Sequence, residues 1–287
     1  MQDSPLNFNP EFLFKKSATE LFITPETQEK TSEKCLNAIS EVNASVEEGA
    51  YPFINVLKEQ SYIEHTGAVF ENIRWAQTMI VVGIGGSNLG ALALKGIFEI
   101  QEAPMRVLFH GDSPDPVALD RLLEKISLEK TVFVIISKSG QTVETMVQYL
   151  YLKTLYQDNE SWQKHFIFIT DPVEGLLRLE ATSHGISTLE IPSGVGGRFS
   201  VLTPVGFLPA LAMGIAIEEL RQGALDCIES ENLKEIVAQF ATTQFQLYEE
   251  GCKVVSCMPY ATQLEEFSKW FRQLWAESLG KNGGGIP

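Results

Sequence analysis

The sequence is poor in basic residues. It contains 22 lysines and arginines against 37 aspartates and glutamates, which gives a formal net charge of −15. A field of this sign disfavours a nucleic-acid backbone or an anionic membrane as a partner, so neither is expected. An anionic substrate would need local hydrogen-bond donors to offset the overall field.

Cysteine is also scarce. The four cysteines form no CxxC pair and have no histidine at metal-ligand spacing (Cys35, Cys227, Cys252 and Cys257). We therefore expect reduced thiols, a cytoplasmic location and no metal site. The N-terminus has neither a basic region nor an apolar core, so we expect no signal peptide.

No apolar run is long enough to cross a bilayer. The longest, Val201 to Ile217, contains Pro204 and Pro209 and is shorter than a spanning helix. We expect a buried helix there.

The middle of the chain alternates short, β-branched apolar runs with helical patterns. The predicted strands are Met79–Val82, Arg106–His110, Thr131–Ile136, Phe166–Thr170 and Ser187–Ile191. The predicted helices between them are Leu89–Ile100, Pro116–Ile126, Thr142–Tyr156 and Val173–Thr182. Near-continuous apolar strands are typical of a parallel sheet covered on both faces. The fold class is therefore α/β, a doubly wound parallel sheet, with ligands expected at the carboxyl ends of strands.

The flanking regions differ from this middle part. Residues 1–75 show helical periodicity at Glu26–Glu48 and Phe53–Trp75 and are interpreted as an N-terminal helical cap. Residues 76–200 form the first α/β domain, and 201–250 are connecting helices, the second at Glu231–Glu249. A strand at Cys252–Met258 and a helix at Ala261–Ser278 then predict the start of a second, truncated α/β domain over 251–287.

Two loops rich in glycine and hydroxyl groups each follow a predicted strand. The first runs from Gly83 to Gly90 and includes Gly86 and Ser87, and the second runs from Ser137 to Thr145. Glycines let a backbone approach an anion, helix-start N–H groups point toward it, and hydroxyls donate without adding charge. Together the loops indicate one phosphate held from two sides. A structural tight turn in the first loop and helix capping by Thr142 remain alternatives.

Three further residues could do chemistry. Arg198 follows glycines at 194, 196 and 197, so its guanidinium could stabilise a developing oxyanion, although most loop arginines are simply solvated. Gln273 and Glu277 are four residues apart and share one helix face. Most glutamates on helices face solvent, and only the sequence context favours a catalytic role for Glu277.

Four segments together resemble the phosphoglucose isomerase family of the sugar isomerase superfamily, which has a flavodoxin-like fold. They begin with the two loops, Gly83–Gly90 and Ser137–Thr145. The others are Gly196–Gly206, which contains Gly-Gly-Arg-Phe-Ser, and Gln273–Lys281, which contains Gln-Leu-Trp-Ala-Glu-Ser. All four occur in the family's order, and the resemblance covers most of the chain from about residue 45.

The resemblance implies roles for particular residues. Ser87, Ser137, Ser139 and Thr142, with the backbone at Lys138, match phosphate-binding positions, and Gly86 and Gln273 match substrate-binding positions. Arg198 matches the arginine that stabilises a cis-enediolate, and Glu277 matches the general base between C1 and C2. The implied reaction is reversible isomerisation of glucose 6-phosphate to fructose 6-phosphate, a step of glycolysis and gluconeogenesis, without metal or organic cofactor. A homodimer is implied for the intact enzyme.

The sequence also departs from the family pattern. The ring-opening histidine and a catalytic lysine of the family follow the Glu277 motif, and this chain ends at Pro287. No histidine present matches that context, so His65, His110, His165 and His184 are not assigned. We expect this polypeptide to be weakly active or inactive alone. The alternatives are a non-catalytic sugar-phosphate-binding regulatory module and an isomerase of another sugar phosphate.

Overall fold

The structure is a computed structural model that describes residues 25–98, 101–111 and 113–281. Predictions that fall on the remaining residues lie outside this description, including the end of the helix predicted at Leu89–Ile100. The chain divides into two compact units. One comprises Pro52–Leu220 and Cys257–Leu274, and the other comprises Met1–Tyr51, Arg221–Ser256 and Trp275–Pro287.

The first unit is built on a five-stranded parallel sheet with the strand order β2-β1-β3-β4-β5. The strands are β1 (Thr78–Val82), β2 (Arg106–His110), β3 (Thr131–Ser137), β4 (Phe166–Thr170) and β5 (Ser187–Glu190). All five predicted strands are present, and the predicted α/β class with a parallel sheet is confirmed. Since β1 and β3 are neighbours, the two predicted loops leave adjacent strands at the same edge of the sheet.

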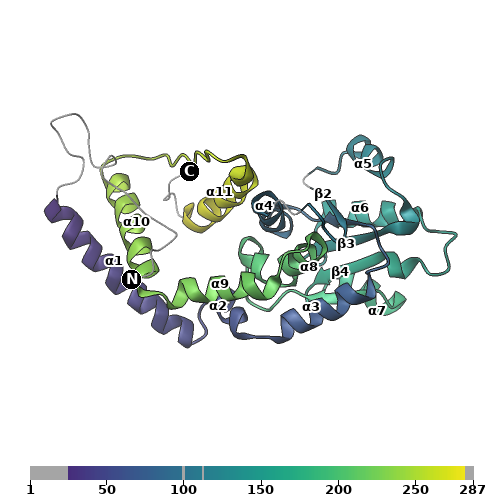
Figure 1. The fold of residues 1–287 in the computed structure, drawn as a ribbon, viewed down its shortest axis with the longest axis horizontal. Helices are drawn as coiled ribbons and strands as arrows, with labels where there is room; N and C mark the ends of the chain where they lie inside the picture. The colour runs from purple at the N-terminus through teal and green to yellow at the C-terminus, as the bar shows by residue number, and fades with distance from the viewer. Residues whose placement is uncertain (1–24, 99–100, 112, 282–287) are drawn as a thin grey trace. The chain divides into compact units, whose positions relative to one another are not determined.

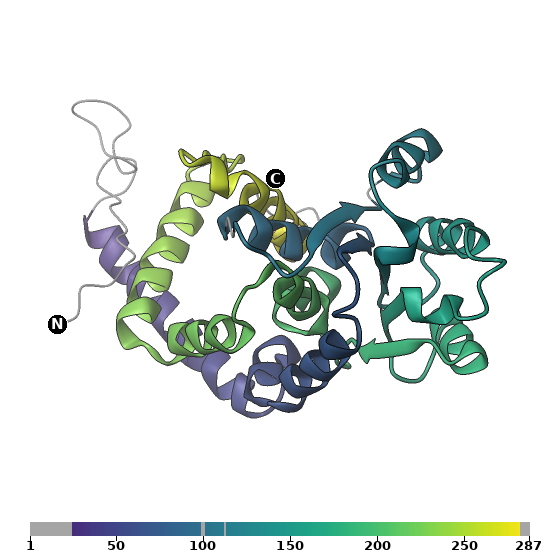
Figure 2. The ribbon, with the colours of Figure 1, turned by 45° about the vertical axis from the view of Figure 1, so that its right-hand side comes forward.

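Side chains of successive strand residues point to opposite faces of the sheet, and each face is covered by helices. Ile80, Phe133 and Phe168 pack in one apolar cluster with residues of α5, α6 and α7, whereas Val81, Val134 and Ile169 pack in another with residues of α3, α4 and α8. Figures 1 and 2 show these two helix layers on either side of the strands. The helices are α3 (Ser61–Asn72), α4 (Leu89–Ile97), α5 (Pro116–Leu123), α6 (Val143–Thr154), α7 (Leu176–His184) and α8 (Pro204–Met213).

The apolar run predicted as one buried helix forms the buried α8 and the start of α9 (Ile217–Glu229). Thr203 caps α8 by accepting a hydrogen bond from the N–H of Val205 at 3.3 Å, and Pro204 occupies the first turn. Gly214 ends the helix with φ of 83°, a left-handed conformation that favours glycine. No described helix is both long and apolar enough to cross a membrane.

The other helices begin and end close to their predicted bounds, with one break. In the second unit, α1 (Pro25–Glu47) packs along α10 (Glu231–Glu249), whose first turn is capped by Ser230. The helix predicted at Phe53–Trp75 is instead three pieces, α2 (Pro52–Asn55), a 3-10 turn (Val56–Lys58) and α3.

The strand predicted at Cys252–Met258 is wrong. The backbone there has no regular secondary structure, and the side chains of Val254 and Met258 are 74% and 69% exposed. A β-strand needs a hydrogen-bonded neighbour, and none of the described strands pairs with this segment. The following helix, α11 (Glu265–Leu279), begins later than predicted, after a 3-10 turn at Thr262–Leu264.

His165 is a buried structural histidine at the start of β4. Its side chain is 1% exposed, its Nδ1 lies 2.9 Å from the carbonyl oxygen of Thr131, and its ring packs on Trp75 and Tyr156. Burial lowers the pKa of His165, and Lys164 adds to this effect, against opposing contributions from the Thr131 carbonyl and Glu129.

This burial predicts a stability change with pH. Because the pKa of His165 is lower in the folded than in the unfolded protein, where it is about 6.5, the unfolded chain binds the proton first. The free energy of unfolding, from urea titrations at pH 5–8, should therefore fall as pH drops below about 6.5. His165→Gln should flatten this slope. A slope unchanged by His165→Gln would contradict the assignment.

Candidate active site

The first loop is a tight turn at the end of β1. It contains a 3-10 turn at Gly85–Ser87, and Gly85 has φ of 55°, which favours glycine. A Cβ placed on Gly83 would stand 2.8 Å from the Cβ of Ser87 and 3.2 Å from the carbonyl oxygen of Ile136. The loop therefore folds back on itself and lies directly against the end of β3.

The second loop joins β3 to α6. Ser137 is buried, and its Oγ lies 2.9 Å from Oγ1 of Thr142. Ser139 Oγ accepts a hydrogen bond from the N–H of Gln141, while the side chains of Lys138 and Ser139 are exposed. The N-terminus of α6 follows at once, and the first N–H groups of a helix have no partner within the helix itself. Hydroxyl groups and helix-start N–H donors therefore gather where the sequence predicts a phosphate.

Thr142 occupies the N-cap position of α6, yet its hydroxyl makes no capping hydrogen bond within the part of the chain that the structure describes. The hydroxyl instead pairs with Ser137. Of the two roles that the sequence left open for Thr142, capping is thus not the one seen here, and the hydroxyl remains near the loop where a ligand oxygen could accept from it.

The Gly-Gly-Arg-Phe-Ser segment packs against the first loop. It forms a 3-10 helix, Gly197–Leu202, and the single hydroxyl hydrogen of Ser200 is shared between the carbonyl oxygens of Gly197 at 2.7 Å and Gly86 at 3.2 Å. A Cβ on Gly86 would overlap the carbonyl of Gly197 and stand 2.5 Å from the nitrogen of Arg198. Only a glycine permits this approach, so Gly86 brings the backbone of Arg198 to the first loop.

The side chain of Arg198 is half-buried. Its guanidinium carbon lies 4.4 Å from the centroid of the Phe199 ring, which in turn stacks on Phe53 with a centroid separation of 4.4 Å. An arginine over an aromatic face keeps its charge while its orientation is restricted. A cation held in this way suits stabilisation of a developing oxyanion.

Helix α11 also reaches these loops. The Nε2 of Gln273 lies 2.9 Å from the position that a Cβ on Gly85 would occupy. Trp270, one turn earlier, donates its indole N–H to the carbonyl oxygen of Arg198 at 3.2 Å. The sequence analysis assigned no role to Ser200 or Trp270. The signal that could have found Trp270 is its N–H, which needs an acceptor when the ring is covered.

Glu277 lies one turn after Gln273 on α11, and its side chain is exposed. The boundary between the two units falls between Leu274 and Trp275, so Glu277 belongs to the unit without the sheet. The structure thus brings Gly86, Ser87, Arg198 and Gln273 together beside the loop of Ser137, Lys138, Ser139 and Thr142. The role of Glu277 stays a prediction.

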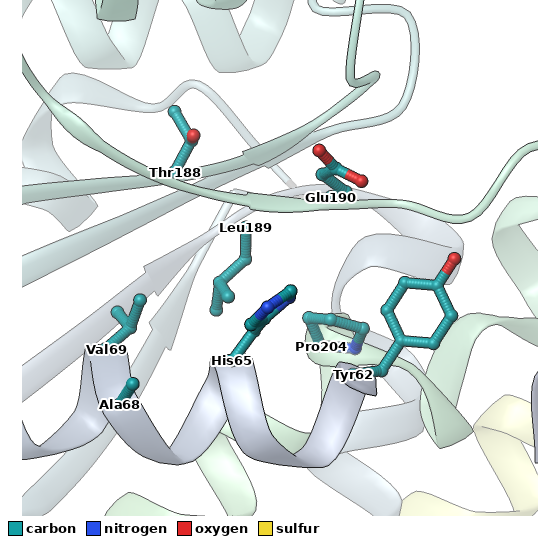
Figure 3. A pocket seen from close by; sticks show the side chains of 8 residues that line it. All are labelled: Tyr62, His65, Ala68, Val69, Thr188, Leu189, Glu190 and Pro204. Carbon is teal, nitrogen blue, oxygen red and sulfur yellow. The ribbon is translucent and has the colours of Figure 1, made fainter. Parts of the chain in front are cut away.

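A separate hollow of about 260 Å³ lies at the β5 edge of the sheet (Figure 3). It is formed between α3 and β5, with Tyr62, His65 and Glu190 as polar groups over an apolar floor that includes Val69 and Leu189. Partial burial raises the pKa of Tyr62, and the carboxylates of Glu59 and Glu190 add to this. A lone carboxylate without a glycine loop is unsuited to phosphate, so the candidate site remains at the two loops.

Within the described ranges, no three histidine, cysteine, aspartate or glutamate side chains gather in a way that could hold a metal ion. The four cysteines are free thiols.

The contact at Gly86 predicts a contrast between two neighbouring glycines. Gly86→Ala should force the first loop away from Gly197, lower the free energy of unfolding by about 1–3 kcal/mol and weaken phosphate binding. Gly197→Ala is the matched control, because a Cβ there meets nothing within 4 Å. Urea unfolding and calorimetric titration with inorganic phosphate measure both effects. Equal effects of the two substitutions would contradict the close approach.

Comparison with known proteins gives a consistent result. The family model described as phosphoglucose isomerase matches residues 26–284. The chain is 37% identical over 267 residues to a glucose-6-phosphate isomerase of Carboxydothermus hydrogenoformans, covering 87% of this chain and 57% of that protein. It is 38% identical over 213 residues to a probable glucose-6-phosphate isomerase of Haloarcula marismortui, covering 73% and 48%.

Solved structures show the same fold. A hypothetical protein from Thermus thermophilus superposes with a TM-score of 0.80 at 30% identity, covering 91% of this chain and 64% of that one. A glucose-6-phosphate isomerase from Chlamydia trachomatis superposes with a TM-score of 0.69, covering 79% and 45%, and at 24% identity it shows the shared fold alone. The chain spans about half the length of the curated relatives it matches. On the strength of the family match and the loops it contains, the chain belongs to the phosphoglucose isomerase family.

Proposed function

We propose that the chain carries the phosphate-binding part of an aldose–ketose isomerase that interconverts glucose 6-phosphate and fructose 6-phosphate. The observation that carries this proposal is the meeting of the first loop, the Arg198 turn and Gln273, beside the hydroxyl-rich second loop. These are the segments on which the family resemblance was based.

The substrate's phosphoryl group would lie between the two loops. The hydroxyls of Ser87, Ser137, Ser139 and Thr142, with backbone N–H groups near Lys138, supply donors that add no positive charge of their own. The N-terminus of α6 adds a partial positive charge at the same place. Such a set can bind a dianion even in a chain whose formal charge is −15.

The chemical step needs a base and a cation. Glu277 would remove a carbon-bound proton at one of C1 and C2 and return it at the other, while the electrons move into a cis-enediolate. The guanidinium of Arg198 would stabilise the negative oxygen of that intermediate. A positioned carboxylate of this kind typically contributes about 10²- to 10⁴-fold in rate. Gln273 would orient the sugar.

Several finer statements belong to the same proposal. The intact enzyme would act as a homodimer in the cytoplasm, in keeping with the family resemblance and with the free thiols. Residues 76–200 would form the first sugar isomerase domain after an N-terminal cap over 1–75, and 201–250 would connect it to a second domain that begins near 251. The proposed reaction needs no metal or organic cofactor.

Phosphate binding can be tested on the chain itself. We expect glucose 6-phosphate to bind, glucose to bind far more weakly, and Ser137→Ala to raise the Kd for glucose 6-phosphate about tenfold, because a hydrogen bond to a charged group is lost. Ser183→Ala, an exposed serine on α7, should leave the Kd unchanged. Calorimetric titration measures all four values. Equal affinity for glucose and its phosphate would count against the site.

Catalysis requires a second experiment. We expect little isomerase activity from this polypeptide alone, since the family's ring-opening histidine and catalytic lysine have no match in it. In a polypeptide extended to the length of the curated relatives, Glu277→Gln should lower kcat about 10²- to 10⁴-fold with little change in phosphate affinity. Glu265→Gln on the same helix is the control. A regulatory sugar-phosphate-binding module would instead keep its full response to sugar phosphate after Glu277→Gln.

A further inference from the structure

Thr170 ends the otherwise apolar strand β4, and it lies beside the second loop. In the parallel pairing of β3 and β4 it is the register partner of Ser137. The preceding partners on the same face are Phe133 with Phe166 and Ile135 with Phe168, all in the cluster under α6 and α7. Because residues in register on parallel strands point to the same face, the Thr170 and Ser137 side chains are neighbours.

The hydroxyl of Thr170 is buried without a hydrogen bond. The residue is 0% exposed, and its Oγ1 has no hydrogen-bond partner among residues 25–98, 101–111 and 113–281. Its carbonyl oxygen, in contrast, accepts from the N–H of Ile191 at 2.9 Å. A buried hydroxyl without a partner destabilises a folded protein, and valine would fill the same space without that cost.

The second loop rests on this hydroxyl. Gly140 has φ of 63°, and a Cβ on it would stand 3.1 Å from Thr170 Oγ1 and 3.2 Å from the Cα of Gly175. The carbonyl of Gly140 is held by the N–H of Leu177 at 3.2 Å. The loop is therefore fixed from below by Thr170 and the start of α7, whereas Lys138 and Ser139 on its outer side are exposed.

The pairing of the loop hydroxyls shows what the hydroxyl of Thr170 could do. Ser137 and Thr142 now share one hydrogen bond with each other, 2.9 Å long. A phosphoryl group that accepts from both hydroxyls removes that bond and leaves the lone pairs of Ser137 Oγ without a donor. The register pairs the Cα atoms of Thr170 and Ser137 across one strand spacing, with both side chains on the same face of the sheet.

We propose that Thr170 is a positioning residue of the phosphate site, whose buried hydroxyl donates to Ser137 Oγ when Ser137 donates to the bound phosphoryl group. Thr170 thus acts through Ser137 and does not touch the ligand. A chain of hydroxyl donors that ends on an anion polarises each member in turn, so the second bond strengthens the first. The unpaired hydroxyl destabilises the free protein, and the hydrogen bond to Ser137 in the complex removes this destabilisation. This inference rests on the proposed function.

The test measures both phosphate binding and the free energy of unfolding. The proposal predicts that removing the Thr170 hydroxyl weakens binding but does not lower stability. Thr170→Val removes the hydroxyl at nearly constant volume. It should leave the free chain at least as stable in urea and should raise the Kd for inorganic phosphate and for glucose 6-phosphate about tenfold. Thr170→Ser retains the hydroxyl and should restore the Kd to within about threefold of the unaltered chain.

Thr242 supplies the matched control. It is 0% exposed on α10, in the other compact unit, and its Oγ1 also lacks a hydrogen-bond partner within the described chain. Thr242→Val should change stability in the same direction as Thr170→Val and leave both Kd values unchanged.

Three outcomes would overturn the inference. Thr170→Val could bind phosphate as tightly as the unaltered chain, or Thr170→Ser could bind as weakly as Thr170→Val, which would implicate packing and not the hydroxyl. Thr170→Val could also lose stability, which would show that the hydroxyl is already paired in the free protein. If the unaltered chain fails to bind phosphate, the proposed function itself fails and the inference with it. Phosphate binding by the unaltered chain therefore distinguishes failure of the proposed function from failure of the inference about Thr170.

Discussion

The candidate site depends on the absence of a side chain at Gly86. A single added carbon there would collide with the backbone of Gly197 and Arg198, which lie more than a hundred residues later in the chain. This backbone contact fixes the Arg198 turn against the first loop, and Ser200 reinforces it with a hydrogen bond to Gly86. Because the contact is made by main-chain atoms, it is insensitive to side-chain rotamers. The orientation of Arg198 therefore follows from the path of the backbone.

The parallel sheet supplies the other constraint. Its strand order places β1 next to β3, so the loops that follow these strands must leave the sheet side by side. The donors that gather there are mostly neutral hydroxyl and amide groups. One carboxylate nearby is favoured in its ionised form: two backbone N–H groups, from Val173 and Glu174, hold the pKa of Asp171 below its usual range, and the Arg178 guanidinium and Lys138 ammonium lower it further. An ionised carboxylate at this edge is thus partly balanced by Lys138, in a protein that is strongly acidic overall.

The sequence predicted the sheet well because short, β-branched apolar runs are an unambiguous pattern. All five strands begin and end within one residue of their predicted bounds. Predictions failed where tertiary context decides. The run Cys252–Met258 has strand-like composition, but composition alone cannot supply a neighbouring strand. Gly214 divides an apolar run into two helices through a left-handed conformation that composition does not reveal.

For the site, the sequence analysis selected both loops, Arg198 and Gln273 but missed the residues that connect them. Ser200, Trp270 and Thr170 act through hydrogen bonds or contacts with residues distant in sequence, so no local pattern marks them. Thr142 is a residue that the sequence analysis did select but whose role the sequence left open. Its position before a helix is equally suited to a cap and to a ligand contact, and only the structure shows that its hydroxyl pairs with Ser137 and does not cap α6.

The hydrogen bond from Trp270 to Arg198 has an experimental consequence. Indole emission shifts in wavelength when its N–H exchanges a protein acceptor for solvent, so this ring is an intrinsic optical reporter placed on the backbone of the arginine itself. Replacing the other three tryptophans, Trp75, Trp162 and Trp275, with phenylalanine would isolate its signal. The docking of the first turns of α11 on the sheet-bearing unit could then be followed in real time without an added label.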